Sequence, residues 1–412
     1  MNSLLIIILI ILAVDFFFNR WLDNLNIKSW KPQLPIEAEG IYDEERYRKS
    51  RDYHLAHHRL SQASSWFSFL LSAVVLSFGL FGKADSLLRN YSEQPIILAL
   101  LFFGALGFLS DILSLPFSLY GIFVIEEKFG FNKMTWKTFL FDKLKSYLLA
   151  VIIGGSLLAA LVFIQQSTGS HFWLYALAVV SIFMIFSLMF YTSLILPLFN
   201  KLTPLTDGEL KEAIKNYCNK TVFNLSNLFV IDGSKRSSKA NAFFSGLGRK
   251  KKIILYDTLV NNRTNDELVA VLAHEVGHYK KKHIRTNLIL GLIQTTVMLF
   301  LLSLFLDSTA LSMALGAAQP SFHINILAFG LLYSPLSEVL GLFMNYISRK
   351  HEFEADRFCA ETFNGEPLMS ALKKLSSDNL SNLTPHPLYV LFHYSHPTLL
   401  QRLKALDIFI KR

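Results

Sequence analysis

The sequence has few cysteines and few charged residues for its length. Only Cys218 and Cys359 occur in 412 residues, without CxxC spacing. A disulfide framework and a thiolate metal site are therefore not indicated, and we expect two inert thiols. Apolar residues make up 52% of the chain, and the mean hydropathy of +0.37 is too high for an ordinary soluble protein. These values predict a membrane protein.

The chain is basic, with a net charge of +9. Its Lys and Arg residues lie between long apolar runs and do not form one interleaved basic and aromatic surface. We therefore expect no nucleic-acid partner, and assign the positive charge to cytoplasmic loops and a lipid-facing surface.

Seven apolar runs are long enough, or nearly so, to cross about 30 Å of hydrocarbon. No basic residue precedes the first run, so we expect an uncleaved span there and not a secretory signal. The chain contains no internal repeat and no low-complexity linker. The runs are Leu4 to Phe18, Trp66 to Phe81, Ile96 to Ile125, Tyr147 to Ile164, Phe172 to Phe199, Leu288 to Leu306 and Ile324 to Ile347.

The distribution of positive charge predicts the orientation of these spans. Lys and Arg are frequent between spans one and two, between spans three and four, and after spans five and seven. The remaining connections contain no Lys or Arg, or contain two such residues whose charge two acidic residues balance. The positive-inside rule then places the N-terminus outside and the C-terminus in the cytosol. We divide the chain into residues 1–199 (spans one to five), 200–285 (a cytosolic protease domain), 286–347 (spans six and seven) and 348–412 (a cytosolic segment).

Residues 200–285 have the pattern of a small α+β domain. A helix is expected around Asp207 to Asn219. Strands are expected near Asn227 to Ile231, Ala240 to Ser245 and Lys252 to Tyr256, with a hairpin turn between the last two. The fold class is therefore mainly α, a polytopic membrane protein with a small α+β domain.

A helix with metal-binding spacing ends this domain. Thr264 and Glu267 form a capping-box pattern, so the helix begins near Thr264. His274 and His278 lie four residues apart and share a face, where both rings can reach one ion. Glu275 lies close enough to form a hydrogen bond with a water molecule bound to that ion. The simpler interpretation is a structural histidine pair, but the apolar neighbours favour a buried zinc site.

A third ligand is expected downstream, because catalytic zinc sites generally have three protein ligands and one open position. Glu352 and Asp356 share a helical face, so Glu352 is the candidate ligand. Asp356 would then accept the free ring N–H of a ligating histidine. The alternative is a solvated helix in which Glu354 and Glu352 pair with Arg349 or Arg357. His351 is a weaker ligand candidate.

Five stretches resemble the type I CAAX prenyl endopeptidases, which are membrane zinc metalloproteases of seven spans. These motifs occur in matching order over almost the whole chain, which makes them far more specific than HExxH alone. They are the HEVGH motif at 274–278, Asn345 to Asp356, Tyr394 to Arg402, Val124 to Lys133, and Gly233 to Gly246.

The resemblance implies one zinc ion per chain, held by His274, His278 and Glu352, with Glu275 as the general base. It further implies a large water-filled chamber enclosed by the spans, with the site at its cytosolic end. Composition and periodicity show no such chamber. They show only polar residues within spans, which are costly in lipid and should face protein or water. These residues are Asp111, Gln294, Glu338 and Asn345.

The resemblance also implies that Asn241, His396 and Arg402 line the substrate cleft. The strand with Asn241, Ala242 and Phe243 offers a backbone edge for an extended peptide. His396 or Arg402 could donate hydrogen bonds to the oxyanion of the tetrahedral intermediate. The simpler interpretations are that Asn241 shapes a strand end and that Arg402 pairs with a carboxylate.

The predicted activity is cleavage of prenylated or other membrane-associated peptides near their C-termini. One alternative is a quality-control protease similar to the heat-shock-induced membrane metalloproteases. Another is a non-catalytic scaffold, although a scaffold has no need of Glu275. The expected partners are a peptide or prenylated peptide and the lipid bilayer. A bacterial inner membrane and the endoplasmic reticulum both suit a catalytic face in the cytosol.

Overall fold

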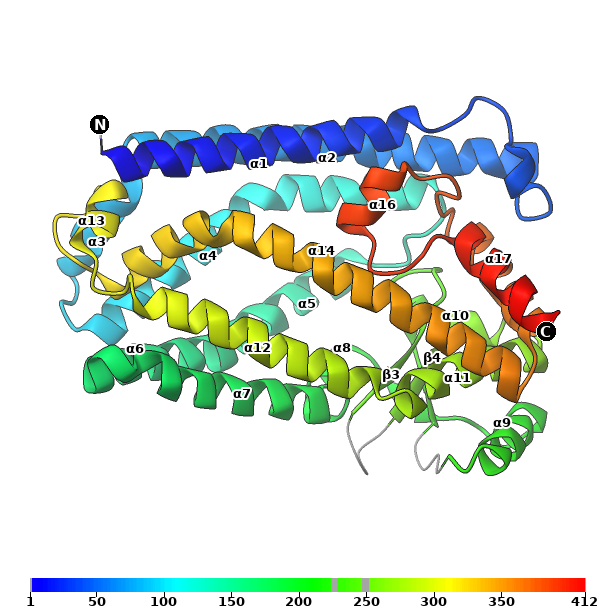
Figure 1. Ribbon diagram of the computed structural model, residues 1–412. Helices are drawn as coiled ribbons and strands as arrows, with labels where there is room; N and C mark the ends of the chain where they lie inside the picture. The colour runs from blue at the N-terminus through cyan, green and yellow to red at the C-terminus, as the bar shows by residue number, and fades with distance from the viewer. Residues whose placement is uncertain (1, 224–227, 247–251, 412) are drawn as a thin grey trace.

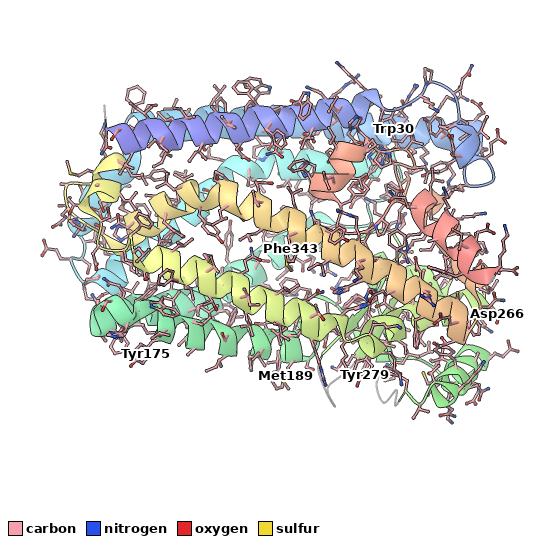
Figure 2. The ribbon with its side chains drawn as sticks, in the orientation of Figure 1. Trp30, Tyr175, Met189, Asp266, Tyr279 and Phe343 are labelled. Atoms are coloured by element: carbon pink, nitrogen blue, oxygen red, sulfur yellow. The ribbon has the colours of Figure 1, made fainter. Side chains whose placement is uncertain are left out.

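Long helices, most of them along one axis, make up most of the molecule, and a small sheet lies at one end of the bundle (Figure 1). The structure is a computed structural model that describes residues 2–223, 228–246 and 252–411. The chain begins at the end of the bundle opposite the sheet and finishes near the sheet (Figure 1). Figure 2 shows Asp266 and Tyr279 at the sheet end and Tyr175 near the other. The two ends of the bundle therefore have different structures.

Six helical stretches within the described ranges are long and apolar enough to cross a membrane, so the prediction of a multi-span protein is confirmed. They are Ser3–Lys28 (α1), Glu44–Ser77 (α2), Pro95–Glu126 (α4 and η2), Trp136–Phe199 (α5 to α8), His283–Ser303 (α12) and Phe322–Thr362 (α14).

The number of spans depends on how the 64-residue stretch Trp136–Phe199 is divided. As one straight helix it would measure about 96 Å, far more than the membrane thickness. A short 3-10 turn at Gly169–His171 interrupts it, and Gly169 there has a φ of 51°. On either side, α6 (Ser156–Thr168) and α7 (Phe172–Phe190) pack against each other. The count of seven spans stays a prediction.

Two of the six long stretches are divided into several helical elements. Besides α6, α7 and the turn between them, these elements are Pro95–Tyr120 (α4), Gly121–Glu126 (η2), Trp136–Leu149 (α5), Ala150–Gly155 (η3), Tyr191–Ile195 (η5) and Leu196–Phe199 (α8). The other described helices are short and connect the spans or surround the sheet. Their bounds are Ile36–Ala38 (η1), Leu80–Arg89 (α3), Glu209–Lys220 (α9), Gly233–Lys235 (η6), Asp257–Val260 (α10), Asn265–Lys280 (α11), Thr309–Ala314 (α13), Gly365–Asp378 (α15), Pro387–His393 (α16) and Leu399–Ile410 (α17).

The described part of the chain forms a four-stranded sheet in the order β1-β2-β4-β3. Three strands lie where the sequence predicts them: β2 (Leu228–Ile231), β3 (Ala242–Ser245) and β4 (Lys252–Tyr256). β1 (Leu202–Pro204) was not expected. β2 and β4 pair in parallel, and β3 pairs antiparallel with β4, which leaves β3 at one edge. The predicted turn at 247–251 and Asn227 lie outside the described residues.

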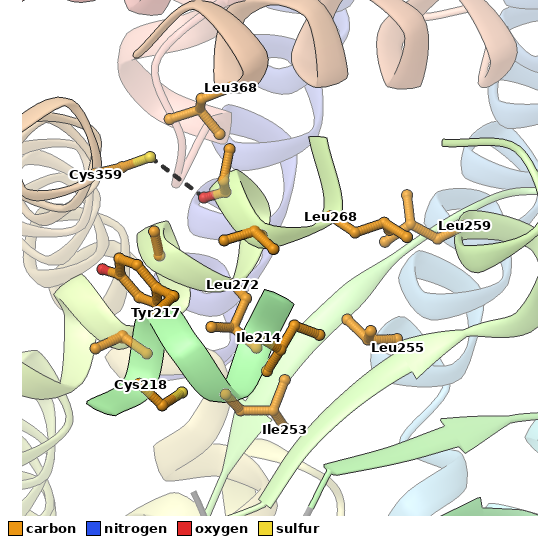
Figure 3. Close-up of a cluster of buried hydrophobic side chains, with 14 of the residues drawn as sticks. Ile214, Tyr217, Cys218, Ile253, Leu255, Leu259, Leu268, Leu272, Cys359 and Leu368 are labelled. Carbon is orange, nitrogen blue, oxygen red and sulfur yellow. Dashed lines mark hydrogen bonds between the residues drawn. The ribbon is translucent and has the colours of Figure 1, made fainter. Parts of the chain in front are cut away.

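A hydrophobic core joins the sheet to α11 (Figure 3). On β4, Ile253 and Leu255 point to one face and belong to the same buried cluster as Ile214 of α9. Leu268 and Leu272 of α11 complete this side. Ile254 points to the opposite face and joins a second cluster. This two-residue alternation fixes which face of the sheet carries α11.

Two polar residues within spans have protein partners. Asp111 of α4 accepts hydrogen bonds from Lys143 and Tyr147 of α5. Asn345 of α14 donates to the carbonyl of Phe392 at 2.8 Å. These contacts agree with the simpler interpretation, in which such residues connect neighbouring segments. The chamber stays a prediction.

Two of the proposed domain boundaries fall inside continuous helices. α12 begins at His283 and runs across the boundary at 285/286, and α14 runs from Phe322 to Thr362 across the boundary at 347/348. The last span and the segment with Glu352 are therefore one helix. The fourfold division stays a prediction.

The capping box predicted at the start of α11 is confirmed. Thr264 Oγ1 accepts from the backbone N–H of Glu267 at 3.3 Å, and Glu267 Oε2 accepts from the backbone N–H of Thr264 at 3.1 Å. Glu267 is buried and also accepts from Ser370 at 2.6 Å and from Lys374 at 2.5 Å. Burial raises the pKa of Glu267, but these hydrogen bonds outweigh it and leave the pKa below its ordinary value.

We predict that Thr264→Ala loosens the first turn of α11. Loss of such a cap costs about 1 kcal/mol, so hydrogen–deuterium exchange in residues 265–270 should accelerate about fivefold. Asn261→Ala, at an exposed position just before the cap, is the control and should leave exchange unchanged. Equal exchange in wild type and Thr264→Ala would show that tertiary packing alone holds this turn.

We also predict an acid-dependent loosening of the same turn. Because the pKa of folded Glu267 is depressed, its stabilisation is present above the ordinary value and is lost as pH falls through the folded value. Exchange in α11, corrected for the intrinsic pH effect, should therefore rise on acidification in wild type. In Glu267→Gln this acid-dependent rise should be much smaller, and an unchanged rise would assign it to another group.

Candidate metal centre and cleft

Three side chains from α11 and α14 meet around one point. His274 Nε2 lies 3.1 Å from His278 Nε2 and 3.5 Å from Glu352 Oε2, and His278 Nε2 lies 3.3 Å from Glu352 Oε1. Ligands at 2.0–2.2 Å in a tetrahedron lie about 3.4 Å apart. The donor atoms therefore fit one small cation, and a metal site at these three residues is consistent with their geometry.

Neither arginine proposed as an alternative partner of Glu352 contacts it; both bind other groups. Arg349 donates to the carbonyl of Tyr394 at 2.7 Å, and Arg357 pairs with Glu361 at 2.7 Å. Glu352 is buried and faces the two histidines instead. The solvated-helix interpretation of this segment is therefore wrong.

A buried carboxylate lies behind His274. Asp356 Oδ1 is 2.9 Å from His274 Nδ1, the contact predicted for it. Burial lowers the pKa of His274, but its hydrogen bonds to Asp356 and Glu352 outweigh this effect and raise the pKa to about 9. The carboxylates thus create a field that favours positive charge at this ring.

Arg402 of α17 binds the same carboxylate. Its Nε lies 2.8 Å and its Nη2 2.6 Å from the two oxygens of Asp356, a bidentate pair. Nη1 lies 3.3 Å from Glu352 Oε2. The simpler interpretation, that Arg402 pairs with a carboxylate, is therefore what the structure shows, although the residue also borders the cleft.

Glu275 borders the same cleft, one residue beyond His274. Burial raises the pKa of its carboxyl group, and the two neighbouring histidines oppose this shift. A carboxylate with a raised pKa accepts a proton more readily near neutral pH. The environment of Glu275 therefore suits a general base.

A close contact between α11 and α14 places these residues together. A Cβ added to Gly277 would lie 3.1 Å from Ala355 Cα and 3.2 Å from its carbonyl oxygen, which is tighter than ordinary packing. The Cys359 thiol donates to the carbonyl of Ala270 at 3.3 Å (Figure 3). Glycine in the HEVGH motif thus allows the two helices to approach.

A cleft of about 400 Å³ opens over the three candidate ligands. All the predicted site residues line it except Asp356, which lies behind His274. Its lining includes Asn241, Ala242, Phe243, His274, Glu275, His278, Glu352, His396 and Arg402. A larger hollow of about 750 Å³ beside α9 contains none of these residues, so size alone does not identify the site.

Asn241 and His396 both line this cleft. The Asn241 side chain accepts from the backbone N–H of Ala242 at 2.8 Å, so it also shapes the start of β3. His396 Nε2 lies 3.3 Å from Glu352 Oε1, and its side chain is 63% exposed. His396 is therefore accessible to a substrate.

The cleft also has an apolar wall, which none of the sequence motifs indicated. Four residues of α15 form it with Leu259 and Val271: Leu368, Ala371, Leu372 and Leu375. Their spacing of i, i+3, i+4 and i+7 is that of one helical face and could have been recognised. No sequence signal indicated that this face borders the metal-binding residues.

The two halves of the chain match two family profiles. The profile described as CAAX prenyl protease N-terminal, five membrane helices, matches residues 24–201, and peptidase family M48 matches residues 204–409. A CAAX prenyl protease 1 homolog of Arabidopsis thaliana is 36% identical over 96% of both chains. CAAX prenyl protease 1 of Saccharomyces cerevisiae is 37% identical over 92% of this chain and 90% of its own length.

The fold also matches a solved structure over its full length. The crystal structure of S. mikatae Ste24p superposes with a TM-score of 0.94 at 34% sequence identity, covering 99% of this chain and all of that one. These matches confirm the family that the five sequence motifs resemble. The chain therefore belongs to the CAAX prenyl endopeptidases of peptidase family M48 and is an integral, multi-pass membrane metalloendopeptidase.

Proposed function

We propose that this protein is a zinc endopeptidase that cleaves prenylated, CAAX-type peptides near their C-termini. The observation that carries the proposal is the triangle of His274, His278 and Glu352, which lies in one cleft with the edge strand β3. Relatives named CAAX prenyl proteases, similar over the whole chain, support the substrate class.

Zinc is the metal we propose for this site. Two imidazole nitrogens and one carboxylate are a frequent ligand set of catalytic zinc, which keeps a fourth position open. When bound there, zinc polarises a peptide carbonyl and makes water more acidic. Asp356 would fix the Nδ1–H tautomer of His274, so that Nε2 faces the cation.

Glu275 is the proposed general base. It takes a proton from the attacking water and transfers it to the nitrogen of the leaving peptide. Its raised pKa favours holding that proton between the two steps. His396 is the more accessible donor for the oxyanion, since Arg402 already donates to Asp356.

The substrate would lie along β3. Among the described strands, β3 has a partner on one side only, so its outer backbone groups are available to an extended peptide. Ala242 and Phe243 lie on this strand and Asn241 immediately precedes it, and all three line the cleft with the candidate ligands. An extended backbone is the conformation that a protease requires around the bond it cuts, and the apolar wall of α15 would receive aliphatic side chains.

The site is proposed to face the cytosol. The N-terminus lies at the end of the bundle opposite α11 and β3 (Figure 1), whose residues line the cleft. The positive-inside distribution places the first residue outside and hence the cleft inside. A bacterial inner membrane or the endoplasmic reticulum would both satisfy this arrangement.

We predict that removing a ligand removes the metal. Elemental analysis of the purified wild type should give one zinc ion per chain, and His278→Ala or Glu352→Gln should reduce this to near zero, because two remaining ligands bind zinc weakly. The control is His171→Ala, at an exposed histidine outside the candidate ligand set. It should still contain one zinc ion per chain. Full zinc in both ligand variants would mean that the ion is held elsewhere.

We predict that Glu275→Gln abolishes cleavage but keeps zinc. The amide has the same shape and cannot accept the proton, so turnover should fall at least about 100-fold. The assay compares a quenched fluorescent peptide with and without a farnesyl-cysteine near its C-terminus. Retained turnover in Glu275→Gln would refute the role of the base.

The same assay separates the candidate functions. Cleavage of the farnesylated peptide alone supports the proposed substrate class. Equal cleavage of both peptides would indicate a general membrane protease. Absence of cleavage by zinc-loaded wild type would favour the non-catalytic scaffold.

The orientation is testable by labelling. Both native cysteines are buried, so Asp207→Cys, at a side chain that is 93% exposed, should be the main reactive thiol. It should react with a membrane-impermeant maleimide only after sealed right-side-out vesicles are permeabilised. Tyr91→Cys, exposed between α3 and α4, should react without permeabilisation. The opposite pattern would invert the proposed topology.

A further inference from the structure

A second pair of side chains lies behind the other candidate histidine ligand, on the side away from the cleft. His278 Nδ1 is 3.0 Å from His283 Nδ1. The other nitrogen of His283, Nε2, is 2.9 Å from Glu354 Oε2. We name His283 and Glu354 the outer pair. They belong to neither the predicted ligand set nor the cleft lining.

The geometry of the outer pair fixes the positions of the protons once Nε2 of His278 faces a cation. Nδ1 of His278 must then carry the proton, and it can donate only if His283 Nδ1 accepts. A neutral His283 with an acceptor at Nδ1 has its proton on Nε2. That proton is directed at the Glu354 carboxylate. Each N–H in the series from His278 through His283 to Glu354 therefore has an acceptor.

The ring of His283 is firmly held. It is the first residue of α12 and is 3% exposed. It stacks on the His351 ring with centroids 3.9 Å apart and planes at 10°. Lys282, immediately before it, has a φ of 62°, a left-handed conformation that turns the chain between α11 and α12. The surrounding structure thus fixes the acceptor for His278 in place.

We propose that His283 and Glu354 are positioning residues that hold His278 in the orientation and tautomer needed for zinc binding. The inference rests on the proposed metal site. The arrangement parallels that of His274 with Asp356, but the acceptor of His278 is itself a histidine oriented by a carboxylate. The two ligands therefore have different supports: Asp356 is fully buried, whereas the Glu354 side chain is 38% exposed.

The outer pair also connects the metal site to the membrane helices. His283 begins α12, Glu354 lies on α14, and His278 lies on α11. A single chain of hydrogen bonds thus runs from the ligand helix α11, through the first turn of α12, to α14. The placement of His278 therefore depends on how α12 and α14 sit against each other.

The test is the zinc affinity of the purified full-length protein in detergent. After removal of metal, zinc is returned in competition with a chromophoric chelator. Loss of such an outer partner typically weakens metal binding 10–100-fold. We expect this loss for His283→Leu, a smaller one of about threefold to tenfold for Glu354→Gln, and partial recovery in His283→Asn. Asparagine places an acceptor oxygen near the position of Nδ1.

His351 belongs neither to the group of candidate ligands nor to the cleft lining. His351→Phe is therefore the matched control, because it keeps a ring against His283 and leaves the hydrogen-bond chain intact. It should bind zinc like the wild type. Recovery in His283→Asn would assign the loss in His283→Leu to hydrogen bonding, because asparagine restores the acceptor without restoring the imidazole ring. If His283→Leu does not fold, the zinc affinities of Glu354→Gln and His283→Asn still distinguish a hydrogen-bonding role from a packing role.

The outcomes separate this inference from the proposed function. A wild type that binds zinc, with unchanged affinity in His283→Leu and Glu354→Gln, would overturn the positioning role alone. Equal losses in His283→Leu and His283→Asn with no loss in Glu354→Gln would assign the effect to packing and overturn it as well. A wild type that binds no zinc would overturn the metal site and, with it, the role of the outer pair.

Discussion

The close contact between α11 and α14 is the constraint on which the rest of the site depends. Gly277 lets the two backbones approach to a distance that a side chain would obstruct, and the Cys359 thiol bonds to the carbonyl of Ala270 at the same interface. Because each helix contributes ligands on one face, this approach brings Glu352 within 3.5 Å of His274. A small outward shift of either helix would separate the donor atoms beyond the span of one ion.

Burying so many ionisable groups at this interface requires that each has a partner, because an unpaired buried charge is strongly destabilising. Asp356 is fully buried and accepts hydrogen bonds from two nitrogens of Arg402. The other carboxylate, Glu352, faces the two histidines and the same guanidinium group. Arg402 belongs to α17, close to the C-terminus of the chain. The last helix thus balances the negative charge of α14, and a cation between the histidines would complete the compensation.

The membrane helices and the site form one structure. α12 begins beside the candidate metal site and continues as an apolar span. α14 begins as an apolar span and continues to the candidate ligand on its C-terminal part. His283 opens the first of these helices, and Glu352 lies on the second. The geometry of the candidate ligands is therefore tied to the packing of the spans.

Features that depend on near neighbours could be predicted from the sequence, because spacings of a few residues define them: the capping box at Thr264, the shared face of His274 and His278, and the apolar runs. The sequence also identified the family through ordered motifs. Four features became visible only in the folded chain: β3 is an edge strand, Arg402 pairs with Asp356, α15 lines the cleft, and His283 contacts His278. These contacts join segments far apart in the chain, and local periodicity contains no information about which faces will meet.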